Sequence, residues 1–586
     1  MEGMGFDMNG YRTHNCGELR TSDIDRTIRL AGWVDTIRDH GGVIFIALRD
    51  HYGVTQIVIN DDSLLKGIGR ESVISAEGLL RARAADTVDT KLATGEVELK
   101  VEQLTLLGKS HTQLPFEISE STKTREDVRL KYRFLDLRNP VVHQNMVLRS
   151  QITQFIRNKM IELGFLEMQT PILTSSSPEG ARDYLVPSRK HPGMFYALPQ
   201  APQIFKQLLM VSGFDKYFQI APCFRDEDSR ADRSPGEFYQ LDFEMSFATQ
   251  EDVLSVAETV LYETFAAFTD KKVSPAPFKR IPYAEAMLNY GTDKPDLRNP
   301  LMIEDLTAFF SGVDFAPFKN KPVRGIVAPN CAGSSKGFFE KMLTFATEIG
   351  MKGLGYISVL AGMELKGPIV KFLSEEQRAE LIAQLNLQED DTLFFISDAP
   401  KLVDKLAGQI RAELGARLDL IAKDVYEFCY VTDYPMFERN EESGAIAFTH
   451  NPFSMPQGEL EALETKDPLD ILAYQYDIVC NGVELSSGAV RNHRPDVMVK
   501  AFEIAGYSKE DIEREFTALF HAFHYGAPPH AGMAPGLDRI VMLLTDQESI
   551  REVIAFPMNA NAQDLLLGAP APVTELQLRE VHVKLR

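Results

Sequence analysis

Cysteine is scarce in this sequence, and its placement argues against a common kind of metal site. Only five cysteines occur in 586 residues, and no two of them form a CxxC pair. Closely spaced cysteine pairs are the usual sign of a structural zinc site. Scattered single cysteines are typical of proteins from a reducing compartment.

The chain also lacks a long apolar run and a basic start. No apolar stretch approaches the roughly 18–20 residues that a helix needs to cross a bilayer. Residues 1–10 contain acidic but no basic side chains, unlike the first part of a secretory signal. We therefore expect a cytoplasmic protein with no membrane partner.

Positive charge is in short supply. The chain has 62 lysines and arginines against 84 acidic residues, a net charge of −22. This sum argues against nucleic acid as a partner, although a local site can differ from the global balance. The length predicts several domains, and the apolar and charged fractions are those of a soluble globular protein.

Residues 217–247 carry the clearest local pattern. Residues 217–224 are apolar and aromatic, and residues 238–247 alternate, which predicts two strands joined by a charged loop at 226–236. One face of the second strand would carry Phe238, Gln240, Asp242, Glu244 and Ser246. The opposite face would carry Tyr239, Leu241, Phe243, Met245 and Phe247. With Arg225 at the open end of the hairpin, this pattern indicates the floor of a site for a polyanionic ligand and a metal. An amphipathic hairpin with a solvated charged face would explain the pattern equally well.

The segments CFRDED at 223–228 and EFYQLDFE at 237–244 resemble motif 2 of the class II aminoacyl-tRNA synthetases. The form is that of the bacterial aspartyl-tRNA synthetases, a subclass IIb family. The resemblance runs from about Tyr11 to Phe556 and includes all three class II motifs in order. It implies a multidomain α/β protein with an N-terminal OB-fold β-barrel, an antiparallel-sheet catalytic domain and an α+β insertion domain.

Domain boundaries follow from the changes of pattern along the chain. We expect the barrel at 1–115, a hinge at 116–141, the catalytic domain at 142–299 and 423–565, the insertion domain at 300–422 and a C-terminal extension at 566–586. A predicted helix at 142–163 and strand at 165–173 resemble motif 1, which forms the dimer interface in the family. The expected assembly is therefore a homodimer.

The first hundred residues predict a small barrel. Strands are expected at 27–35, 43–49, 54–60 and 97–107, and the OB-fold is the barrel that binds single-stranded nucleic acid. Phe45 and Gln56 would supply a stacking ring and an amide, although a lone Phe in a strand more often lies in a core. The resemblance places Arg38, Phe45 and Gln56 on the tRNA anticodon.

Two further barrel positions concern the choice of tRNA. In the family, a His matching His40 marks enzymes that charge both tRNA-Asp and tRNA-Asn, whereas strict enzymes often have Leu there. A second marker, usually Gly in the relaxed enzymes, aligns with Asp86. Our hypothesis is a non-discriminating enzyme; a strictly discriminating one is the alternative, with His40 only a turn residue.

The resemblance also identifies an aspartate pocket. Gln203 and Lys206 share one face of a helix predicted to start near Pro202, where solvated polar residues are the alternative interpretation. The residues expected around aspartate are Glu179, Gln203, Lys206, Arg225, Gln240, Asp242, His450 and Arg491. Asn451 departs from the family, which usually has a second His there.

The nucleotide and metal sites draw on motifs 2 and 3. Asn481-Gly482 predicts a hairpin turn between strands that carry Asp477 and Glu484, close enough to share one hard cation, Mg²⁺. The glycines before Arg539 would let the backbone come close to a phosphate at the N-terminus of the helix that follows. The residues expected around ATP are Arg225, Asp226, Glu227, Phe238, Glu484, Gly536, Leu537, Asp538 and Arg539.

Three of these residues are expected to be catalytic: Arg225, Glu484 and Arg539. Arg225 would hold the α-phosphate and Arg539 the γ-phosphate through their guanidinium groups, and Phe238 would stack on adenine. Ser234 stands in the motif 2 loop where some relatives have Gln. The reaction implied is activation of L-aspartate by ATP, then transfer to the 3′ end of tRNA. The other interpretations are an asparaginyl or lysyl enzyme, which would lack the Lys206/Arg491 pair, and a non-catalytic RNA-binding relative, which would have lost motif residues.

Overall fold

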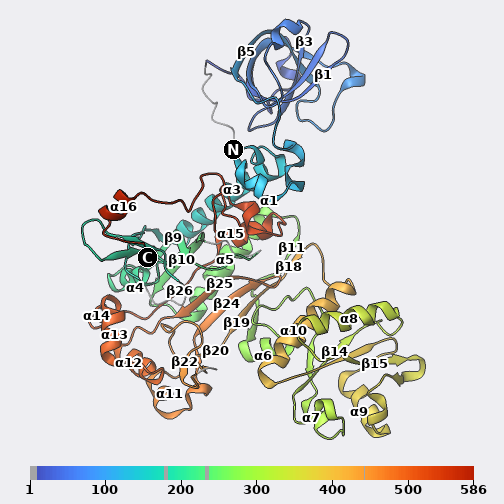
Figure 1. Ribbon diagram of the computed structural model, residues 1–586. Helices are drawn as coiled ribbons and strands as arrows, with labels where there is room; N and C mark the ends of the chain where they lie inside the picture. Colours follow the sequence, from blue (N-terminus) through green and yellow to red (C-terminus); the bar gives the residue numbers. More distant parts are fainter. Residues whose placement is uncertain (1–9, 177–181, 231–235, 441–442, 586) are drawn as a thin grey trace. The chain divides into compact units, whose positions relative to one another are not determined.

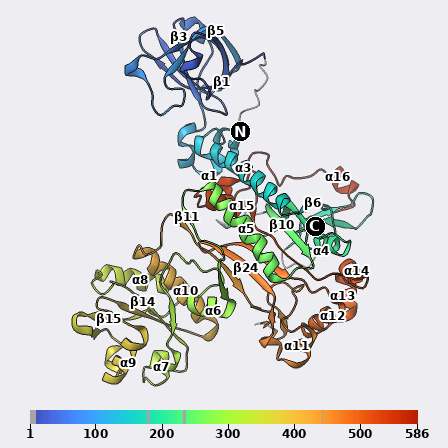
Figure 2. The ribbon, with the colours of Figure 1, turned by 180° about the vertical axis from the view of Figure 1, so that it is seen from behind.

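The computed structural model describes residues 10–176, 182–230, 236–440 and 443–585. The chain forms two compact units that divide between Glu120 and Ser121, seen from opposite sides in Figures 1 and 2. All five cysteines lie in the described ranges and are buried free thiols. No helix in these ranges is long and apolar enough to span a membrane.

The first unit is a closed five-stranded barrel with the strand order β1-β2-β3-β5-β4. Its strands are β1 Thr27–Asp39, β2 Ile44–Arg49, β3 Val54–Ile59, β4 Val73–Ala82 and β5 Val97–Gly108. Along β2, Ile44, Ile46 and Leu48 point into the core, whereas Phe45 and Ala47 alternate with them and remain partly exposed. The predicted OB-type barrel is confirmed, and the alternative of Phe45 as a core residue is wrong.

One barrel strand, β4, was not among those predicted. Its buried positions include Ala76 and Gly78, which give little apolar signal in the sequence. A Cβ at Gly78 would lie 1.9 Å from the carbonyl oxygen of Lys100 on β5. The barrel therefore needs a residue without a side chain at this point of close approach.

The predicted hinge is helical where it enters the second unit. It contains η4 Ile118–Lys123, α1 Glu126–Lys131 and α2 Arg133–Asp136. Arg129 and Arg133 are buried with Asp136, and Arg129 donates two hydrogen bonds to Glu552, at 2.8 and 2.7 Å. The segment from 121 onward is thus packed into the second unit, whereas the predicted hinge ran from 116 to 141.

An eight-stranded sheet forms the centre of the second unit, in the order β12-β19-β24-β25-β26-β10-β9-β6. The strands, in this order, are Lys279–Pro282, Phe428–Thr432, Gln475–Cys480, Val483–Val490, His530–Met533, Gly236–Ser246, Lys216–Arg225 and Leu166–Glu167. The six central strands are antiparallel, and β12 and β6 add in parallel at the two edges. This confirms the predicted antiparallel catalytic sheet.

Three helices cover one face of this sheet: α3 Pro140–Glu162, α5 Gln250–Phe268 and α15 Leu537–Leu544 (Figure 1). Their apolar side chains form one cluster with Leu241, Phe243 and Met245 of β10. The alternation predicted for this strand is confirmed up to Met245. It fails at Phe247, which follows the strand with φ +54° and is 74% exposed.

On the polar face of β10, α4 Gln203–Val211 contacts the strand through Lys206 and Asp242. It packs with a helical group whose members are α11 Glu459–Thr465, α12 Pro495–Ile504, α13 Lys509–Glu515 and α14 Thr517–Phe523. The small strand pairs are β7 Leu185–Pro187 with β8 Phe195–Ala197, β11 Lys272–Val273 with β18 Val425–Tyr426, β20 Tyr434–Pro435 with β23 Leu472–Ala473, and β21 Phe437–Arg439 with β22 Ile446–Phe448. After α15 and η9 Ile550–Val553 the chain ends with α16 Glu575–Glu580, inside the predicted C-terminal extension.

The insertion has its own antiparallel sheet, in the order β13-β14-β17-β15-β16. Its strands are Ile303–Asp305, Val323–Ala328, Thr392–Ser397, Gly355–Leu360 and Glu364–Lys366 in that order, and its helices are α7 Thr307–Ser311, α8 Lys336–Glu348, α9 Glu375–Leu385 and α10 Pro400–Arg417. One apolar cluster packs α8 and α10 against the sheet, and another packs α7 and α9. The predicted α+β character is confirmed.

Candidate active site

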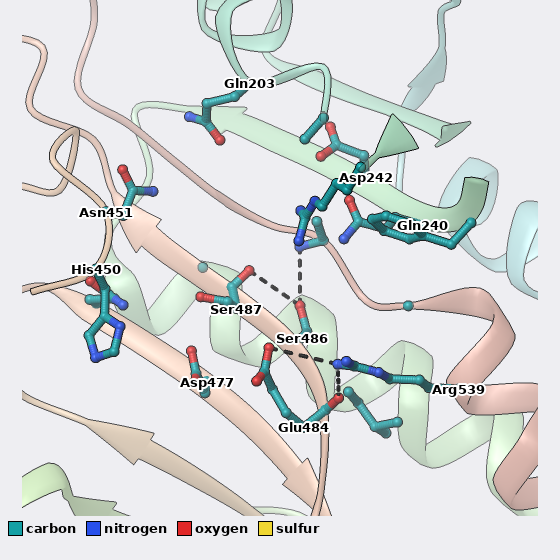
Figure 3. Close-up of a pocket in the computed structure, with 18 of the residues that line it drawn as sticks. Gln203, Gln240, Asp242, His450, Asn451, Asp477, Glu484, Ser486, Ser487 and Arg539 are labelled. Carbon is teal, nitrogen blue, oxygen red and sulfur yellow. Dashed lines mark hydrogen bonds and ion pairs between the residues drawn. The ribbon is translucent and has the colours of Figure 1, made fainter. Parts of the chain in front are cut away.

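The second unit contains a cavity of about 430 Å³ above the β9–β10 and β24–β25 hairpins. Figure 3 shows polar side chains from both hairpins, from α4 and from α15 converging on it. The predicted residues that line it are Gln203, Lys206, Arg225, Glu227, Phe238, Gln240, Asp242, His450, Asp477, Glu484, Arg491, Gly536, Asp538 and Arg539. Glu179 and Ser234 lie outside the described residues.

A buried ionic cluster forms one end of the cavity. Lys206 Nζ lies 2.9 Å from Asp242 Oδ2 and 3.3 Å from Glu244 Oε2. Two guanidinium nitrogens of Arg491 donate hydrogen bonds to the Glu244 carboxylate, at 2.7 and 3.1 Å. Side-chain exposure of all four groups is 2% or less, so each charge depends on its partners.

Glu244 pairs with both cations of this cluster, although no role of its own was predicted for it. Burial opposes its negative charge, but Arg491 and Lys206 lower the pKa of Glu244 below its ordinary value. A Cβ at Gly532 on the neighbouring strand would lie 2.0 Å from Glu244 Oε2. The carboxylate therefore occupies space that only a glycine opposite leaves free.

The remaining aspartate-pocket candidates surround this cluster. Gln203 begins α4 one turn before Lys206, as predicted, and its Nε2 has no hydrogen-bond partner among the described residues. Gln240 accepts a hydrogen bond from the Cys223 thiol at 3.3 Å. His450 is solvent-exposed at the cavity border, where its ring meets Tyr434 edge-on, at a centroid distance of 5.1 Å.

Asn451, the departure from the family pattern, also lines the cavity. Its Oδ1 accepts a hydrogen bond from the backbone N–H of Phe453 at 2.9 Å. The amide therefore stabilises the turn after His450.

The β24–β25 hairpin presents two carboxylates at the other end of the cavity. Its turn residues Asn481 and Gly482 have φ values of +52° and +80°, which confirms the predicted turn. Asp477 is buried and accepts a hydrogen bond from Tyr434 Oη at 2.8 Å. Burial, and then repulsion by Glu484, raise the pKa of Asp477 above its ordinary value. Both carboxylates point into the same space in Figure 3.

This pair fits a hard divalent cation. The carboxylate repulsion is what a bound cation would relieve, and Mg²⁺ is commonly held by one or two carboxylates together with substrate phosphates. Among the described residues, no group of three or more His, Cys, Asp or Glu side chains gathers as a metal site. The described residues therefore suit a cation that takes its other ligands from substrate and water.

Two predicted phosphate-binding arginines, Arg225 and Arg539, also line the cavity. Arg539 Nη1 donates to the backbone oxygen of Glu484 at 2.6 Å and lies 3.8 Å from its Oε1. The Arg225 guanidinium lies over the Phe238 ring, 4.9 Å from its centroid. Arg225 forms no ion pair with another described residue, and its Nε has no hydrogen-bond partner among them.

Of the predicted ATP residues, Asp538 lines the cavity but has protein partners, whereas Leu537 and Asp226 lie outside the lining. Asp538 is buried and accepts the Tyr239 N–H at 2.9 Å, while its Oδ1 lies 2.5 Å from Arg149. Leu537 is part of the apolar core rather than the cavity lining. Asp226 also lies outside the lining, with an exposed side chain facing Arg182.

Lys294 and Asp293, which no motif marks, also line the cavity. Lys294 Nζ lies 2.6 Å from Asp293 Oδ2 and 3.3 Å from Glu484 Oε2. Both residues belong to the loop between α6 Tyr283–Tyr290 and β13. A single Asp-Lys pair in a loop gives no periodic signal, so the sequence could not single it out.

The barrel places its predicted anticodon residues on one outer face. Arg38 pairs with Phe45 across β1 and β2, and Ala47 pairs with Gln56 across β2 and β3. The His40 ring contacts the Phe45 ring edge-on, at a centroid distance of 5.5 Å. Asp86 lies exposed in the 3₁₀ turn Ala85–Thr87.

Comparison with known proteins gives matches for both units. The family described as tRNA synthetases class II (D, K and N) matches residues 125–560, and the OB-fold nucleic acid binding domain matches residues 28–107. The aspartate–tRNA(Asp/Asn) ligases of Rickettsia bellii and Rickettsia conorii are each 56% identical to this chain, over 99% of it and 98% of theirs.

Solved structures agree at the level of the fold. A putative aspartyl-tRNA synthetase from Leishmania major is 20% identical, with a TM-score of 0.59, and covers 94% of this chain and 95% of its own. Asparaginyl-tRNA synthetase from Pyrococcus horikoshii, complexed with asparaginyl-adenylate, is 19% identical, with a TM-score of 0.56, and covers 93% and 97%. With a family match over most of its length, the chain belongs to the class II tRNA synthetases of the D, K and N group.

Proposed function

We propose that this protein is an aspartate–tRNA ligase that activates L-aspartate with ATP and charges both tRNA-Asp and tRNA-Asn. The buried cluster of Lys206, Asp242, Glu244 and Arg491 carries the proposal, because it fixes two cations at one end of a cavity whose other end suits a nucleotide and a metal. The names of the Rickettsia relatives support the same substrate and tRNA pair.

Activation is a displacement at phosphorus. A carboxylate oxygen of aspartate bonds to the α-phosphorus of ATP, the bond from that phosphorus to the bridging oxygen breaks, and its electron pair leaves with pyrophosphate. Arg225 is proposed to hold the α-phosphate and Arg539 the γ-phosphate. Neither residue acts as a nucleophile, so their contribution is orientation and charge stabilisation.

The second step transfers the aspartyl group to tRNA. The 3′-terminal adenosine hydroxyl bonds to the aspartyl carbonyl carbon, loses its proton and displaces AMP. A phosphate oxygen of the departing AMP can take this proton, so the step needs no side-chain base. The ionic cluster would keep the aspartyl side chain in place during both steps.

Amino-acid choice would depend on charge rather than shape, because aspartate and asparagine are nearly isosteric. Lys206 and Arg491 can meet a side-chain carboxylate, whereas the amide of asparagine would leave cationic donors poorly satisfied in a dry site. Such unsatisfied groups oppose binding strongly. The same argument favours an aspartyl enzyme over the asparaginyl and lysyl members of the family.

Asp477 and Glu484 are the proposed Mg²⁺ ligands. The ion, when bound, would neutralise phosphate charge. The two side chains would hold it at the phosphate end of the cavity, away from the cations of the aspartate pocket.

The outer face of the barrel is the proposed anticodon site. The half-buried Phe45 ring can stack on a base. Arg38 lies opposite Phe45 on β1, and Gln56 on β3 lies opposite Ala47, two residues along β2 from Phe45. His40 touches that ring, which supports its role in accepting both tRNAs. The Asp86 marker, where relaxed enzymes usually have Gly, gives this role no support.

A homodimer is the proposed assembly. The edge strand β6 and its surroundings expose apolar side chains, with Ile161 54%, Leu166 55% and Leu173 54% exposed. An exposed sheet edge with an apolar border is a typical protein interface. A cytoplasmic location remains an expectation from the sequence.

The deciding experiment is ATP–pyrophosphate exchange with aspartate, asparagine or lysine as the only amino acid. Exchange that depends on aspartate supports the proposal, whereas dependence on either of the others refutes it. Charging of tRNA-Asn and tRNA-Asp transcripts by wild type and His40→Leu then tests tRNA choice. A wild-type preference for tRNA-Asp of several hundred-fold would rule out the non-discriminating activity.

A further inference from the structure

The phosphate end of the cavity contains a third cation besides Arg225 and Arg539. The cavity is lined by five cationic side chains: Lys206, Arg225, Lys294, Arg491 and Arg539. Two of them, Lys206 and Arg491, are held by buried carboxylates. Lys294 instead meets Glu484, one of the two proposed metal ligands, through a pair whose side chains remain 34% and 27% exposed.

The charge on Lys294 is retained in this setting. Its ammonium lies 2.6 Å from the Asp293 carboxylate and 3.3 Å from the Glu484 carboxylate, and a lysine is charged at neutral pH. A partly exposed ion pair of this kind is worth little by itself. The ammonium can therefore exchange Glu484 for a more highly charged partner at small cost.

The loop that carries Lys294 is fixed from the insertion domain. Arg411 of α10, which is only 3% exposed, donates to the backbone oxygens of Leu301 at 2.6 Å, Asn299 at 2.7 Å and Asp296 at 3.1 Å. Asn299 returns a hydrogen bond to the Arg411 carbonyl oxygen at 3.0 Å. Such a loop presents its side chains in a set position rather than sampling many.

A second contact holds the start of the same loop. A Cβ at Gly291 would lie 2.4 Å from the Cα of Gly408 on α10, so the two backbones touch where α6 ends. Gly291 has φ +69°, which favours glycine there as well. Lys294 is thus three residues beyond an anchored point.

We propose that Lys294 is a further polyphosphate-binding residue of this active site. It pairs with Glu484 in the free enzyme and moves to the leaving pyrophosphate when metal and nucleotide bind. The inference rests on the proposed function, since pyrophosphate leaves only in the activation step. The ammonium would offset the charge that pyrophosphate gains as the α-phosphorus bond breaks.

The proposal predicts two effects of opposite sign in Lys294→Gln. The KM for pyrophosphate in the exchange reaction rises roughly 10–100-fold, as expected for loss of one charged hydrogen bond, while the KM for aspartate stays within about twofold. Without nucleotide, the affinity for Mn²⁺ alone rises roughly two- to fivefold, because no ammonium competes for Glu484. The Mn²⁺ affinity is measured from the paramagnetic resonance signal of unbound Mn²⁺. Mn²⁺ binding that disappears in Glu484→Gln is the binding that belongs to this site.

A matched control is Arg298→Gln, which removes one positive charge from the same loop. Arg298 pairs with Asp296 and lies outside the cavity lining, so both constants should stay at wild-type values. An unchanged KM for pyrophosphate in Lys294→Gln, or weaker Mn²⁺ binding, would overturn the proposal. If wild type shows no aspartate-dependent exchange, the proposed function itself fails, and the Mn²⁺ measurement still tests the Lys294–Glu484 competition.

Discussion

At the Lys206 end of the cavity each charge of the ionic cluster has an opposite charge within 3.3 Å, and none of the four side chains is more than 2% exposed. At the Glu484 end Asp477 is buried, but the side chains of Lys294, Glu484 and Arg539 remain partly exposed. Arg539 lies 3.8 Å from the Glu484 carboxylate. The first arrangement is complete before substrate arrives and so suits selection of one amino acid. The second can change partners, which suits a metal and a triphosphate.

Removing a cation from the Lys206 end of the cavity should have the largest effect on activity. We expect Arg491→Leu to lower kcat/KM for aspartate about 10³–10⁴-fold, because losing one charged partner in a dry site costs up to about 5 kcal/mol. The KM for ATP should change by only a few-fold, since the nucleotide end keeps its cations. Exchange kinetics with each substrate varied in turn measure both values.

The same substitution should destabilise the fold, because it leaves Glu244 buried and uncompensated, at a cost of about 3–5 kcal/mol. The double variant Arg491→Leu/Glu244→Gln removes both charges. It should regain most of the lost thermal stability but not aspartate activation. Wild-type aspartate kinetics in a folded double variant would show that the pocket has been misplaced.

At the phosphate end of the cavity, Arg225→Ala should reduce kcat for ATP–pyrophosphate exchange about 10²–10³-fold, as in the loss of one transition-state donor. Its melting temperature should stay near that of wild type, because Arg225 forms no ion pair with another described residue. Near-normal exchange by the folded variant would reject the α-phosphate assignment. The contrast between this variant and Arg491→Leu separates catalytic from structural charge.

A smaller effect is expected from Phe238→Ala. Stacking of a base on an aromatic ring is worth about 1–3 kcal/mol, which corresponds to a roughly 5–150-fold higher KM for ATP. The KM for aspartate should not change, because the ring faces Arg225 rather than the buried cluster. Phe238→Tyr keeps the ring and serves as the control; a matching loss in that variant would argue against stacking.

The smallest effect is on stability and concerns His530, which lies in β26 next to the strand that carries Glu244. Its Nε2 lies 3.1 Å from Gln207 Oε1 and its Nδ1 lies 2.8 Å from the Pro528 carbonyl oxygen. Burial lowers the pKa of His530 to about 4, although Glu244 partly opposes this shift.

The unfolded chain therefore takes up a proton at this position near pH 6.5, before the folded protein does. Stability is lost as the pH falls from about 6.5 towards 4, by about 1 kcal/mol between pH 8 and pH 6. His530→Gln should reduce the drop in melting temperature over this interval. An identical pH dependence in wild type and variant would contradict the assignment.

Much of this architecture could be predicted from periodicity. The alternation from Tyr239 to Met245 identified the strand and its buried face, because one side packs on helices and the other carries polar groups. The helix that starts after Pro202 placed Gln203 and Lys206 on one face.

What the sequence could not predict depends on distant partners. The spacing placed Glu244 on the same face as Asp242, but its pairing with Arg491 joins positions 247 residues apart. Lys294 belongs to a loop without a periodic pattern, and only Arg411, more than a hundred residues later, fixes that loop. The helical turns after Glu120 were hard to predict because Arg129, Arg133 and Asp136 are buried there beside two leucines, and a hydropathy pattern treats such charged residues as exposed.

The wide separation of Glu244 from Arg491 also sets an order for folding on the ribosome. At about 5–20 residues per second, synthesis of the 247 residues between them takes on the order of 10–50 s. During that interval β10 lacks its neighbour β26, and its edge is open to other chains. The insertion, whose apolar clusters involve only residues 301–420, completes its own core meanwhile. The nascent protein is therefore expected to expose an unfinished catalytic sheet beside a folded insertion, so it should depend on chaperones most strongly just before β26 emerges.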